Sequence, residues 1–137
     1  MALYTKKHAL AGLREKLPAL EVLPNKFKGY KITIIIPEYA SLCPRTGLPD
    51  VGTITIEYEP DASFVELKSL KLYILGYRNL GIFYENAVNR ILKDFVRSVK
   101  PRWAAVRGEF NPRGGMRSIV ESEFRRDRRS LPKRIDK

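Results

Sequence analysis

The stretch VGTITIEYEPDASFVELKSLKLYILGYRN, residues 51–79, changes its hydrophobic period after Pro60. Before the proline, Ile54, Ile56 and Tyr58 alternate with threonine and glutamate, and this period of two predicts a half-buried strand. After it, apolar residues recur at steps of three and four, which predicts a helix; they are Leu67, Leu70, Ile74 and Tyr77. One stretch therefore joins a strand to a helix and indicates a mixed α and β protein.

The predicted helix is apolar on nearly all sides, because Leu72 and Leu75 lie outside the face that the other apolar residues form. A helix of this kind is buried on more than one face, so we expect a second subunit to cover part of it. Asn79 and Gly81 are expected to close the helix.

The residues that precede this stretch predict an arm and a strand. Residues 1–28 indicate a weakly ordered arm with a short helix over Ala9–Leu17, ended by Pro18. The β-branched run Ile32–Ile36, bounded by Gly29 and Pro37, predicts a strand.

The residues that follow it predict a second helix, over Ile82–Val99, and then two short strands, over residues 102–112 and 116–124. The segment NPRGG between these strands is typical of a hairpin connection. Residues 125–137 form a basic tail that we expect to be frayed or to contact a partner.

The order strand, strand, helix, helix, strand, strand predicts one α+β domain over residues 1–137. In this domain an antiparallel four-stranded sheet carries two helices on one face. Such a sheet has open edges that favour pairing with other subunits, and a ring of protomers would remove these edges.

The amino-acid composition limits the kinds of site and partner that fit this chain. The chain has 26 basic and 15 acidic residues, so its surface attracts polyanions or phosphorylated ligands, although solvated surface charge explains the same numbers. One cysteine rules out an internal disulfide, and one histidine (His8) argues against a metal site. No apolar run approaches the ~20 residues that cross a bilayer, and the N-terminus lacks a signal peptide pattern. We therefore expect a cytoplasmic protein without a membrane contact.

The only cysteine lies in SLCPRTGLPD, residues 41–50. A lone cysteine is usually a buried structural residue. Cys43, however, follows a strand in a turn rich in proline and glycine, where a side chain can face a cleft. Asp50 is near enough along the loop to return to it, which suggests a nucleophile with an acid that moves a proton.

Other charged residues have both a structural and a functional interpretation. Glu85, in the first turn of the second predicted helix, suits the helix dipole, but on the arc of Val88 and Leu92 it would need donors such as the N–H edge of a guanine-like ring. Lys68 and Lys71 share a helix face and form either a solvated patch or a phosphate site. Arg113 in NPRGG is either a turn residue or an anion contact.

Four segments together resemble the QueF nitrile reductase family. They are PEYASLCPRTGLPDVGTITIEYEP, ELKSLKLYILGYRN, FYENAVNRILKDF and FNPRGG, in that order between Pro37 and Gly115. The second segment matches the family signature E-[SL]-K-[SA]-x-K-x-[YFW] from Glu66 to Tyr73.

The resemblance implies a tunnelling fold (T-fold) that assembles into pentamers or decamers with active sites between subunits. It also implies that NADPH reduces 7-cyano-7-deazaguanine (preQ0) to the 7-aminomethyl compound, on the queuosine pathway. Cys43 would be the nucleophile that forms a covalent thioimide, Asp50 the proton donor and Glu85 the carboxylate that binds the deazaguanine ring. The other implied contacts are Glu66, Leu67 and Tyr84 with substrate, and Lys68, Ser69, Lys71 and Arg113 with NADPH.

One residue departs from the family pattern. Members usually carry FHE where this chain has Phe83-Tyr84-Glu85. A tyrosine donates hydrogen bonds but titrates near ~10, so a proton relay at this position is in doubt.

Two alternatives stay open at the level of sequence. A related amidinotransferase that forms archaeosine uses the same cysteine on the same nitrile, but acts on the base within tRNA and takes no NADPH. The basic charge and the missing histidine favour it, whereas the complete lysine signature argues against it. A basic ring that binds RNA without catalysis is the second alternative.

Overall fold

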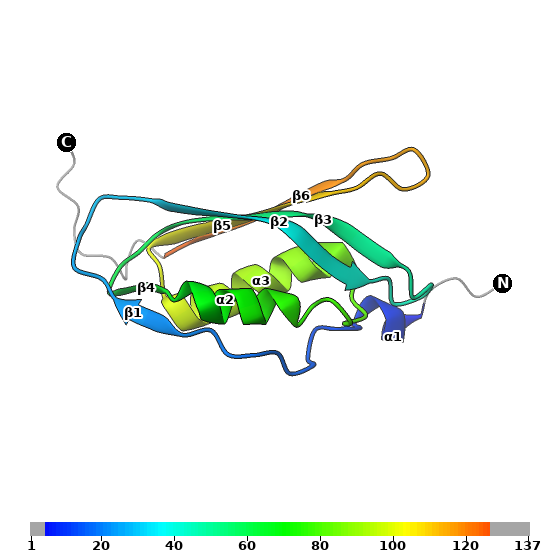
Figure 1. The fold of residues 1–137 in the computed structure, drawn as a ribbon, viewed down its shortest axis with the longest axis horizontal. Coiled ribbons are helices and arrows are strands. Elements are labelled where there is room, and N and C mark those ends of the chain that lie inside the picture. The colour runs from blue at the N-terminus through cyan, green and yellow to red at the C-terminus, as the bar shows by residue number, and fades with distance from the viewer. Residues whose placement is uncertain (1–4, 127–137) are drawn as a thin grey trace.

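The computed structural model describes residues 5–126, which form a four-stranded antiparallel sheet with helices against one face (Figure 1). The strands follow one another in the sheet in the order β2-β3-β5-β6, which confirms the predicted sheet. Their bounds are Ile32–Leu42 for β2, Pro49–Glu59 for β3, Trp103–Phe110 for β5 and Ile119–Arg125 for β6. Strands β2 and β6 form the two edges of this sheet.

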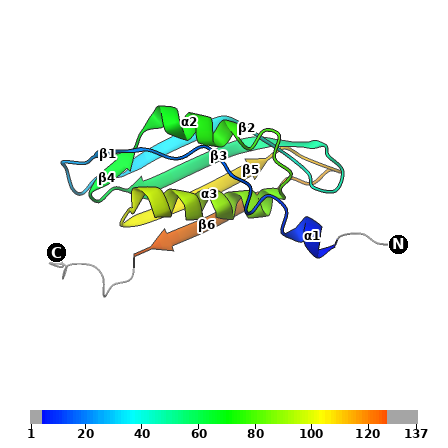
Figure 2. The ribbon, with the colours of Figure 1, turned by 90° about the horizontal axis from the view of Figure 1, so that it is seen from below.

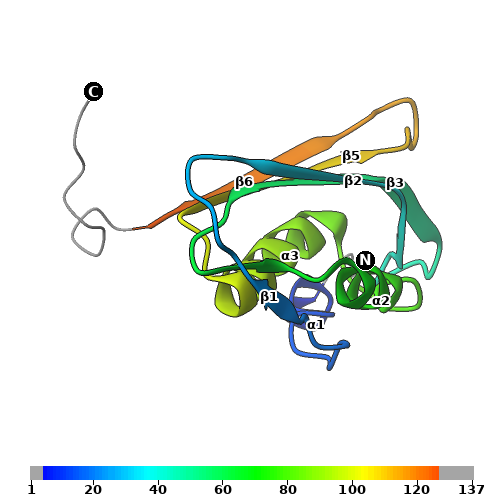
Figure 3. The ribbon, with the colours of Figure 1, turned by 60° about the vertical axis from the view of Figure 1, so that its left-hand side comes forward.

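The helices α2 (Leu67–Leu75) and α3 (Tyr84–Val99) lie side by side on the same face of the sheet, and no helix of residues 5–126 covers the other face (Figures 2 and 3). The core lies between the two layers. There the inward residues of β3 meet the buried side of α3, and the rings of Tyr58 and Phe95 lie 4.7 Å apart in an edge-to-face arrangement. Strand β3 is therefore half-buried, with alternate residues facing the core, as its period of two predicted.

Strand β2 runs six residues beyond the predicted end at Ile36. The expected stop at Pro37 is wrong because the β2–β3 register shifts between Ile36 and Tyr39, which is a β-bulge or irregularity on an edge strand. A proline is tolerated at such a place because its missing N–H is not needed in the ladder. The extension carries Tyr39 and Ser41 into the buried interior and places Cys43 just beyond the strand.

The N-terminal arm differs most from its prediction. The expected helix over Ala9–Leu17 is wrong: α1 is a short helix, Lys6–Ala9, that Thr5 caps. Gly12 then adopts a φ of +82° against Ile82, where a Cβ would come within 2.4 Å of the Ile82 side chain, so the chain turns there.

From residue 5 on, the arm is bound to the domain and not loose. The Arg90 guanidinium donates to the carbonyls of Gly12 and Glu15, and Asn86 donates to Ala9. The arm then adds a two-stranded sheet that the sequence did not predict, between β1 (Val22–Pro24) and β4 (Ser63–Val65).

Both main helices are shorter than predicted. Helix α2 ends at Leu75, before the expected stop near Asn79, because Gly76 caps it beneath Leu17 and Pro18 of the arm. Helix α3 starts two residues later than Ile82. The outer side of α2 exposes Leu67, Leu72 and Leu75, so the apolar stripe expected to meet another subunit is uncovered in one chain. The predicted basic tail lies outside the described residues from 127 on.

Candidate active site

A closed turn between β2 and β3 holds the cysteine. The Cys43 amide donates to the Leu48 carbonyl and the Gly47 amide donates to the Cys43 carbonyl, both at 2.8 Å. Gly47 has a φ of +73°, a conformation that favours glycine. The predicted turn therefore fixes the backbone of Cys43 at its base.

The Cys43 thiol is free, and its residue is only 9% exposed. Burial by itself raises the pKa of this thiol, as does the negative charge of Asp50. Hydrogen bonds from the Thr46 side chain and from the amides of Thr46 and Arg45 outweigh both, so the pKa of Cys43 lies below its ordinary value. The turn thus favours the thiolate, which is the nucleophilic form.

Asp50 lies in β3, directly opposite Ser41 of β2, and is 5% exposed. The guanidinium of Arg113 donates to its carboxylate. Arg113 belongs to the connection between β5 and β6, where its amide donates to the Met116 carbonyl at 2.8 Å. The predicted hairpin is confirmed, and it brings a cation to the acid.

A cavity of about 310 Å³ separates the cysteine turn from the hairpin. Residues 48–51 and 110–113 line it, so Asp50 and Arg113 face one space. This volume is at the lower end of the range for small-molecule sites. Cys43 is not among the residues that line it.

The start of α3 lies beside this space. The Tyr84 ring stacks on Phe110 with centroids 4.1 Å apart, and its hydroxyl donates to Ser118 Oγ at 2.9 Å. Tyr84 therefore anchors the β5–β6 hairpin to the helix. The loop before α3 also pairs with the end of β2, since the Leu42 amide donates to the Leu80 carbonyl at 2.9 Å.

Glu85 does not point toward the apolar side of α3, as the sequence led us to expect. It is exposed, and it begins an exposed row at steps of four residues; the others are Asn89, Lys93 and Arg97. The expected arc is wrong because Val88, three residues on, lies about 60° around the helix from Glu85, which is enough to leave the core. The carboxylate is therefore open to a ligand.

The lysine signature begins α2. The Glu66 carboxylate accepts from the amides of Lys68 and Ser69, at 2.9 and 2.7 Å, and these bonds lower its pKa. The Ser69 hydroxyl accepts from the Glu21 amide of the arm at 2.9 Å. Glu66 and Ser69 thus hold the helix start and the arm, whereas Leu67, Lys68 and Lys71 are exposed.

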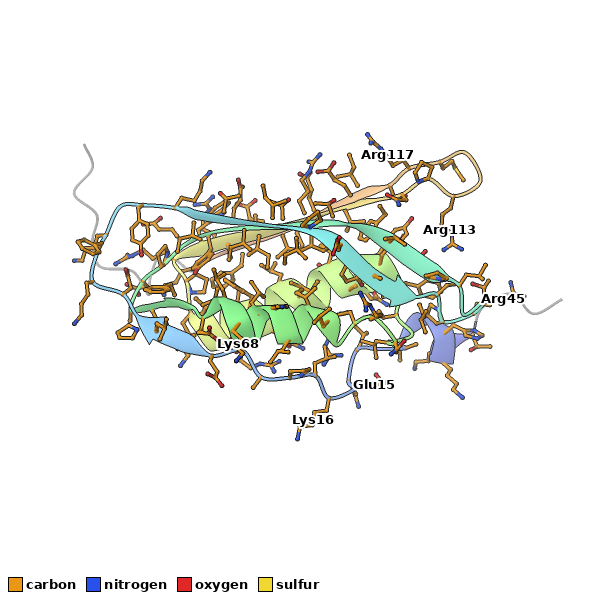
Figure 4. All side chains as sticks on the ribbon, viewed as in Figure 1. Glu15, Lys16, Arg45, Lys68, Arg113 and Arg117 are labelled. Atoms are coloured by element: carbon orange, nitrogen blue, oxygen red, sulfur yellow. The ribbon has the colours of Figure 1, made fainter. Side chains whose placement is uncertain are left out.

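The predicted residues divide between two regions of one chain. Asp50, Arg113 and Tyr84 lie together at the end of the sheet where Cys43 sits. Figure 4 shows Lys68 on α2, far from Arg45 and Arg113. Arg113, predicted as a cofactor contact, donates a hydrogen bond to Asp50 and lies away from Lys68.

Comparison with known proteins identifies the family of this chain. The model of a family described as QueF-like protein matches residues 49–129. The chain is 52% identical over 122 residues to an NADPH-dependent 7-cyano-7-deazaguanine reductase of Elusimicrobium minutum (strain Pei191), and the match covers 88% of this chain and 92% of the relative. The chain belongs to the QueF family.

A second relative in the QueF family has the same printed name. It comes from Chlorobaculum tepidum and is 52% identical over 107 residues, which are 77% of this chain and 92% of the relative. The resemblance that the four sequence segments indicate is therefore confirmed.

A solved structure confirms the fold class. The apo form of the archaeosine synthase QueF-Like matches with a TM-score of 0.62, over 72% of this chain and 95% of that one. At 19% identity the likeness shows a common α+β fold and no more.

Sequence reasoning missed two buried polar residues near Asp50. Tyr39 and Ser41 are fully buried in β2 on the side of Asp50, and neither hydroxyl has a hydrogen-bond partner among the described residues. The alternation of PEYASL continues the period of the strand, but Pro37 was taken as its end. Treating Pro37 as the site of a bulge, and not as the end of the strand, would have placed both residues in β2.

Proposed function

We propose that this protein is an NADPH-dependent reductase of 7-cyano-7-deazaguanine that forms the 7-aminomethyl compound for queuosine. The observation that carries the proposal is the 52% identity to named reductases over 92% of their length. The buried thiol with a lowered pKa, next to an acid, supplies the chemistry that this reaction needs.

Cys43 acts as the nucleophile. A nitrile is a poor hydride acceptor, whereas a thioimide is a better one, so thiolate addition splits one difficult step into easier ones. The hydrogen bonds from Thr46 and Arg45 stabilise the thiolate before it attacks. The Cys43 sulfur then forms a bond to the nitrile carbon.

Asp50 acts as the acid. Addition to a nitrile places negative charge on its nitrogen, which a proton donor must quench. Asp50 lies on the neighbouring strand with its carboxyl buried, near enough to Cys43 for its charge to act on the thiol. Glu85, exposed at the start of α3, accepts from the N–H groups of the deazaguanine ring.

The lysine signature fits NADPH through its phosphates. Lys68 and Lys71 are both exposed and lie three residues apart on α2, so their ammonium groups form one positive patch. When bound, NADPH supplies the two hydrides. Glu66 and Ser69 keep the start of α2 in place beneath this patch.

The active site is completed between protomers of a ring. Arg45 of the cysteine turn and Lys68 of the lysine patch lie in separate regions of one chain (Figure 4). Strands β2 and β6 are the sheet edges that would pair with neighbours, and exposed Leu67, Leu72 and Leu75 provide an apolar surface beside the lysines. No helix among the described residues is long and apolar enough to span a bilayer. A reducing cytoplasm keeps the single thiol free.

The test uses preQ0 with and without NADPH. Without NADPH, the native protein gains the mass of preQ0, and Cys43→Ala abolishes the adduct while retaining the native circular dichroism spectrum. With NADPH, two equivalents are oxidised for each preQ0. A folded native sample that forms no adduct contradicts the mechanism.

The same assay separates the amidinotransferase alternative. That enzyme would act only on tRNA with ammonia or glutamine and would leave NADPH unoxidised. The likeness to the archaeosine synthase concerns the fold alone, so no observation favours this alternative over the reductase.

A further inference from the structure

The N-terminal arm packs against the loop that connects α2 to α3. Gly12 is buried there with a φ of +82°, and a Cβ on it would lie 2.4 Å from the Ile82 Cβ and 2.6 Å from the Gly81 carbonyl oxygen. Side chains do not approach other atoms so closely, so only glycine lets the arm come this near. The backbone of the arm is therefore in direct contact with residues 81 and 82.

The same loop supports the cysteine turn. Both backbone groups of Leu42 are bonded to the loop 80–82, the amide to one of its carbonyls and the carbonyl to one of its amides, each at 2.9 Å. Gly81 also faces the turn, since a Cβ on it would lie 3.8 Å from the Pro44 Cα. The loop thus contacts the residues on both sides of Cys43.

Arg90 of α3 holds the arm in this place. Its two terminal nitrogens donate to the carbonyls of Gly12 and Glu15, and its Nε donates to the Asp94 carboxylate at 3.2 Å. The Arg90 side chain is only 10% exposed, and a buried guanidinium is costly unless its charge is paired and its donors are used. Asp94 supplies the charge partner, so the planar fork of the guanidinium can fix the direction of the arm at Gly12.

The arm therefore connects α3 to the cysteine turn. It passes over the start of α3 on its way from α1 to β1 (Figure 2). Through Gly12 it packs on the loop 80–82, and that loop is bonded to Leu42, the residue before Cys43. A change in the arm at Gly12 should consequently move the backbone of the cysteine.

We propose that Arg90 and Gly12 are positioning residues for the thiol of Cys43 and act through the arm and the loop 80–82. They determine where the nucleophile lies and take no part in the bond changes. A nucleophile must come within ~3–3.5 Å of the carbon that it attacks, and a misplacement of ~1 Å can cost ~10²-fold in rate. The inference rests on the proposed reductase function, in which this thiol attacks the nitrile.

The test compares Arg90→Gln and Gly12→Ala with the native full-length protein. Loss of the guanidinium releases two carbonyls of the arm, and a methyl group on Gly12 forces the arm and the loop apart. In both variants we expect the rate of preQ0 adduct formation without NADPH to fall about 10- to 100-fold. The circular dichroism spectrum at the assay temperature should stay native.

A second readout needs no preQ0. Iodoacetamide alkylates the thiolate of Cys43, so the pH midpoint of the alkylation rate follows the pKa of the thiol. Burial and the charge of Asp50 raise this pKa, but hydrogen bonds from Thr46 and Arg45 outweigh them and the turn as a whole lowers it. A loosened turn should move the midpoint up, toward the ordinary 9.0. An arm that only stabilised the fold would change the melting temperature and leave this midpoint native.

Each variant has a matched control. Arg97 lies on the same helix and pairs with the same Asp94, at 3.7 Å, but its side chain is 67% exposed. Arg97→Gln therefore removes an equal charge and leaves the bonds to the arm intact. Gly29 has a similar φ, of +75°, and a Cβ on it would meet no atom of the described residues within 4 Å, so Gly29→Ala adds the backbone strain without the contact. Both controls should keep the native adduct rate and midpoint.

The results separate the inference from the function on which it rests. If either the adduct rate or the midpoint stays native in both Arg90→Gln and Gly12→Ala, the inference is overturned, as it is by equal changes in the controls. Should one variant fail to fold, Asn86→Ala takes its place, because Asn86 donates to the Ala9 carbonyl of the arm at 2.8 Å. If the native protein itself forms no adduct, the proposed function fails, and the midpoint alone decides whether the arm positions the thiol.

Discussion

Arg113 donates a hydrogen bond to the carboxylate of Asp50 across 63 residues of chain. An ion pair requires a carboxylate, whereas proton donation requires a carboxylic acid, so Asp50 cannot do both at once. Arg113 is 42% exposed at a hairpin turn and can leave, whereas Asp50 is fixed in a strand. In the proposed mechanism, substrate binding must therefore separate this pair before Asp50 donates a proton.

The first prediction concerns this pair. Arg113→Ala should still form the preQ0 adduct, at a rate no lower than native, because the acid no longer has to be released. It should lower the free energy of unfolding by about 1–2 kcal/mol, since a buried carboxylate loses a partly exposed partner. Adduct formation followed by mass spectrometry and urea unfolding measure both. An Arg113→Ala protein that forms no adduct would show that the guanidinium takes part in the addition.

The second prediction concerns the pH dependence of Cys43. Only the thiolate reacts with iodoacetamide, and the pKa of this thiol lies below the ordinary 9.0, so the alkylation rate should reach half its maximum below that pH. Thr46→Val should move the midpoint up, because a bond to the thiolate is lost. Asp50→Asn should move it down, because a negative charge is removed. A midpoint at or above pH 9.0 in the native protein would contradict the conclusion that the turn lowers the pKa of Cys43.

The third prediction concerns Glu85. Glu85→Gln should weaken preQ0 binding about 10- to 100-fold, because charged hydrogen bonds contribute ~1.5–3 kcal/mol. Its melting temperature should stay native, since the side chain is exposed. Glu15→Gln removes the same charge from the exposed arm and serves as the control in calorimetric titration of the Cys43→Ala protein (Figure 4). Equal affinities in the two variants would remove Glu85 from the substrate site.

The fourth prediction concerns assembly. Cys43→Ala and the double variant Lys68→Ala/Lys71→Ala should each be inactive as pure proteins. If sites form between protomers, mixed rings made by joint refolding recover part of the activity, because some sites receive a native half from each variant. Joint refolding of Cys43→Ala with Asp50→Asn, whose residues lie at the same end of the β2–β3 pair in one chain, is the control that should recover none. No recovery in the first mixture would place each site within one chain.

The fifth prediction contrasts two buried tyrosines. Tyr58→Phe should cost about 1–3 kcal/mol of unfolding free energy, because the buried Val65 amide loses its acceptor. Tyr39→Phe should cost nothing or stabilise the protein, because its hydroxyl has no partner to lose among the described residues. Urea unfolding at equal protomer concentration provides the comparison. A large loss in Tyr39→Phe would reveal a bond that stabilises the resting fold.

Local patterns were enough to predict the layers of this protein. The alternation around Ile54 and the three- and four-residue steps of α3 predict a strand and a helix because each depends on neighbours along the chain. The turn around Cys43 was likewise readable, since Gly47 and the prolines act locally. The family signature from Glu66 to Tyr73 required no structure.

Contacts between distant segments decided the rest. Asp50 pairs with Arg113 and faces Ser41 across the β2–β3 ladder. No local sequence pattern predicts either contact. The arm is held by contacts with distant residues, among them Arg90, some 75 residues away, which binds its carbonyls. Pairing in three dimensions also set the bulge at Pro37, which turned Tyr39 and Ser41 inward. The sequence thus determined which groups are available for the proposed chemistry. The tertiary structure determined which of them meet, because hydrogen bonds and ion pairs depend on distances in space and not along the chain.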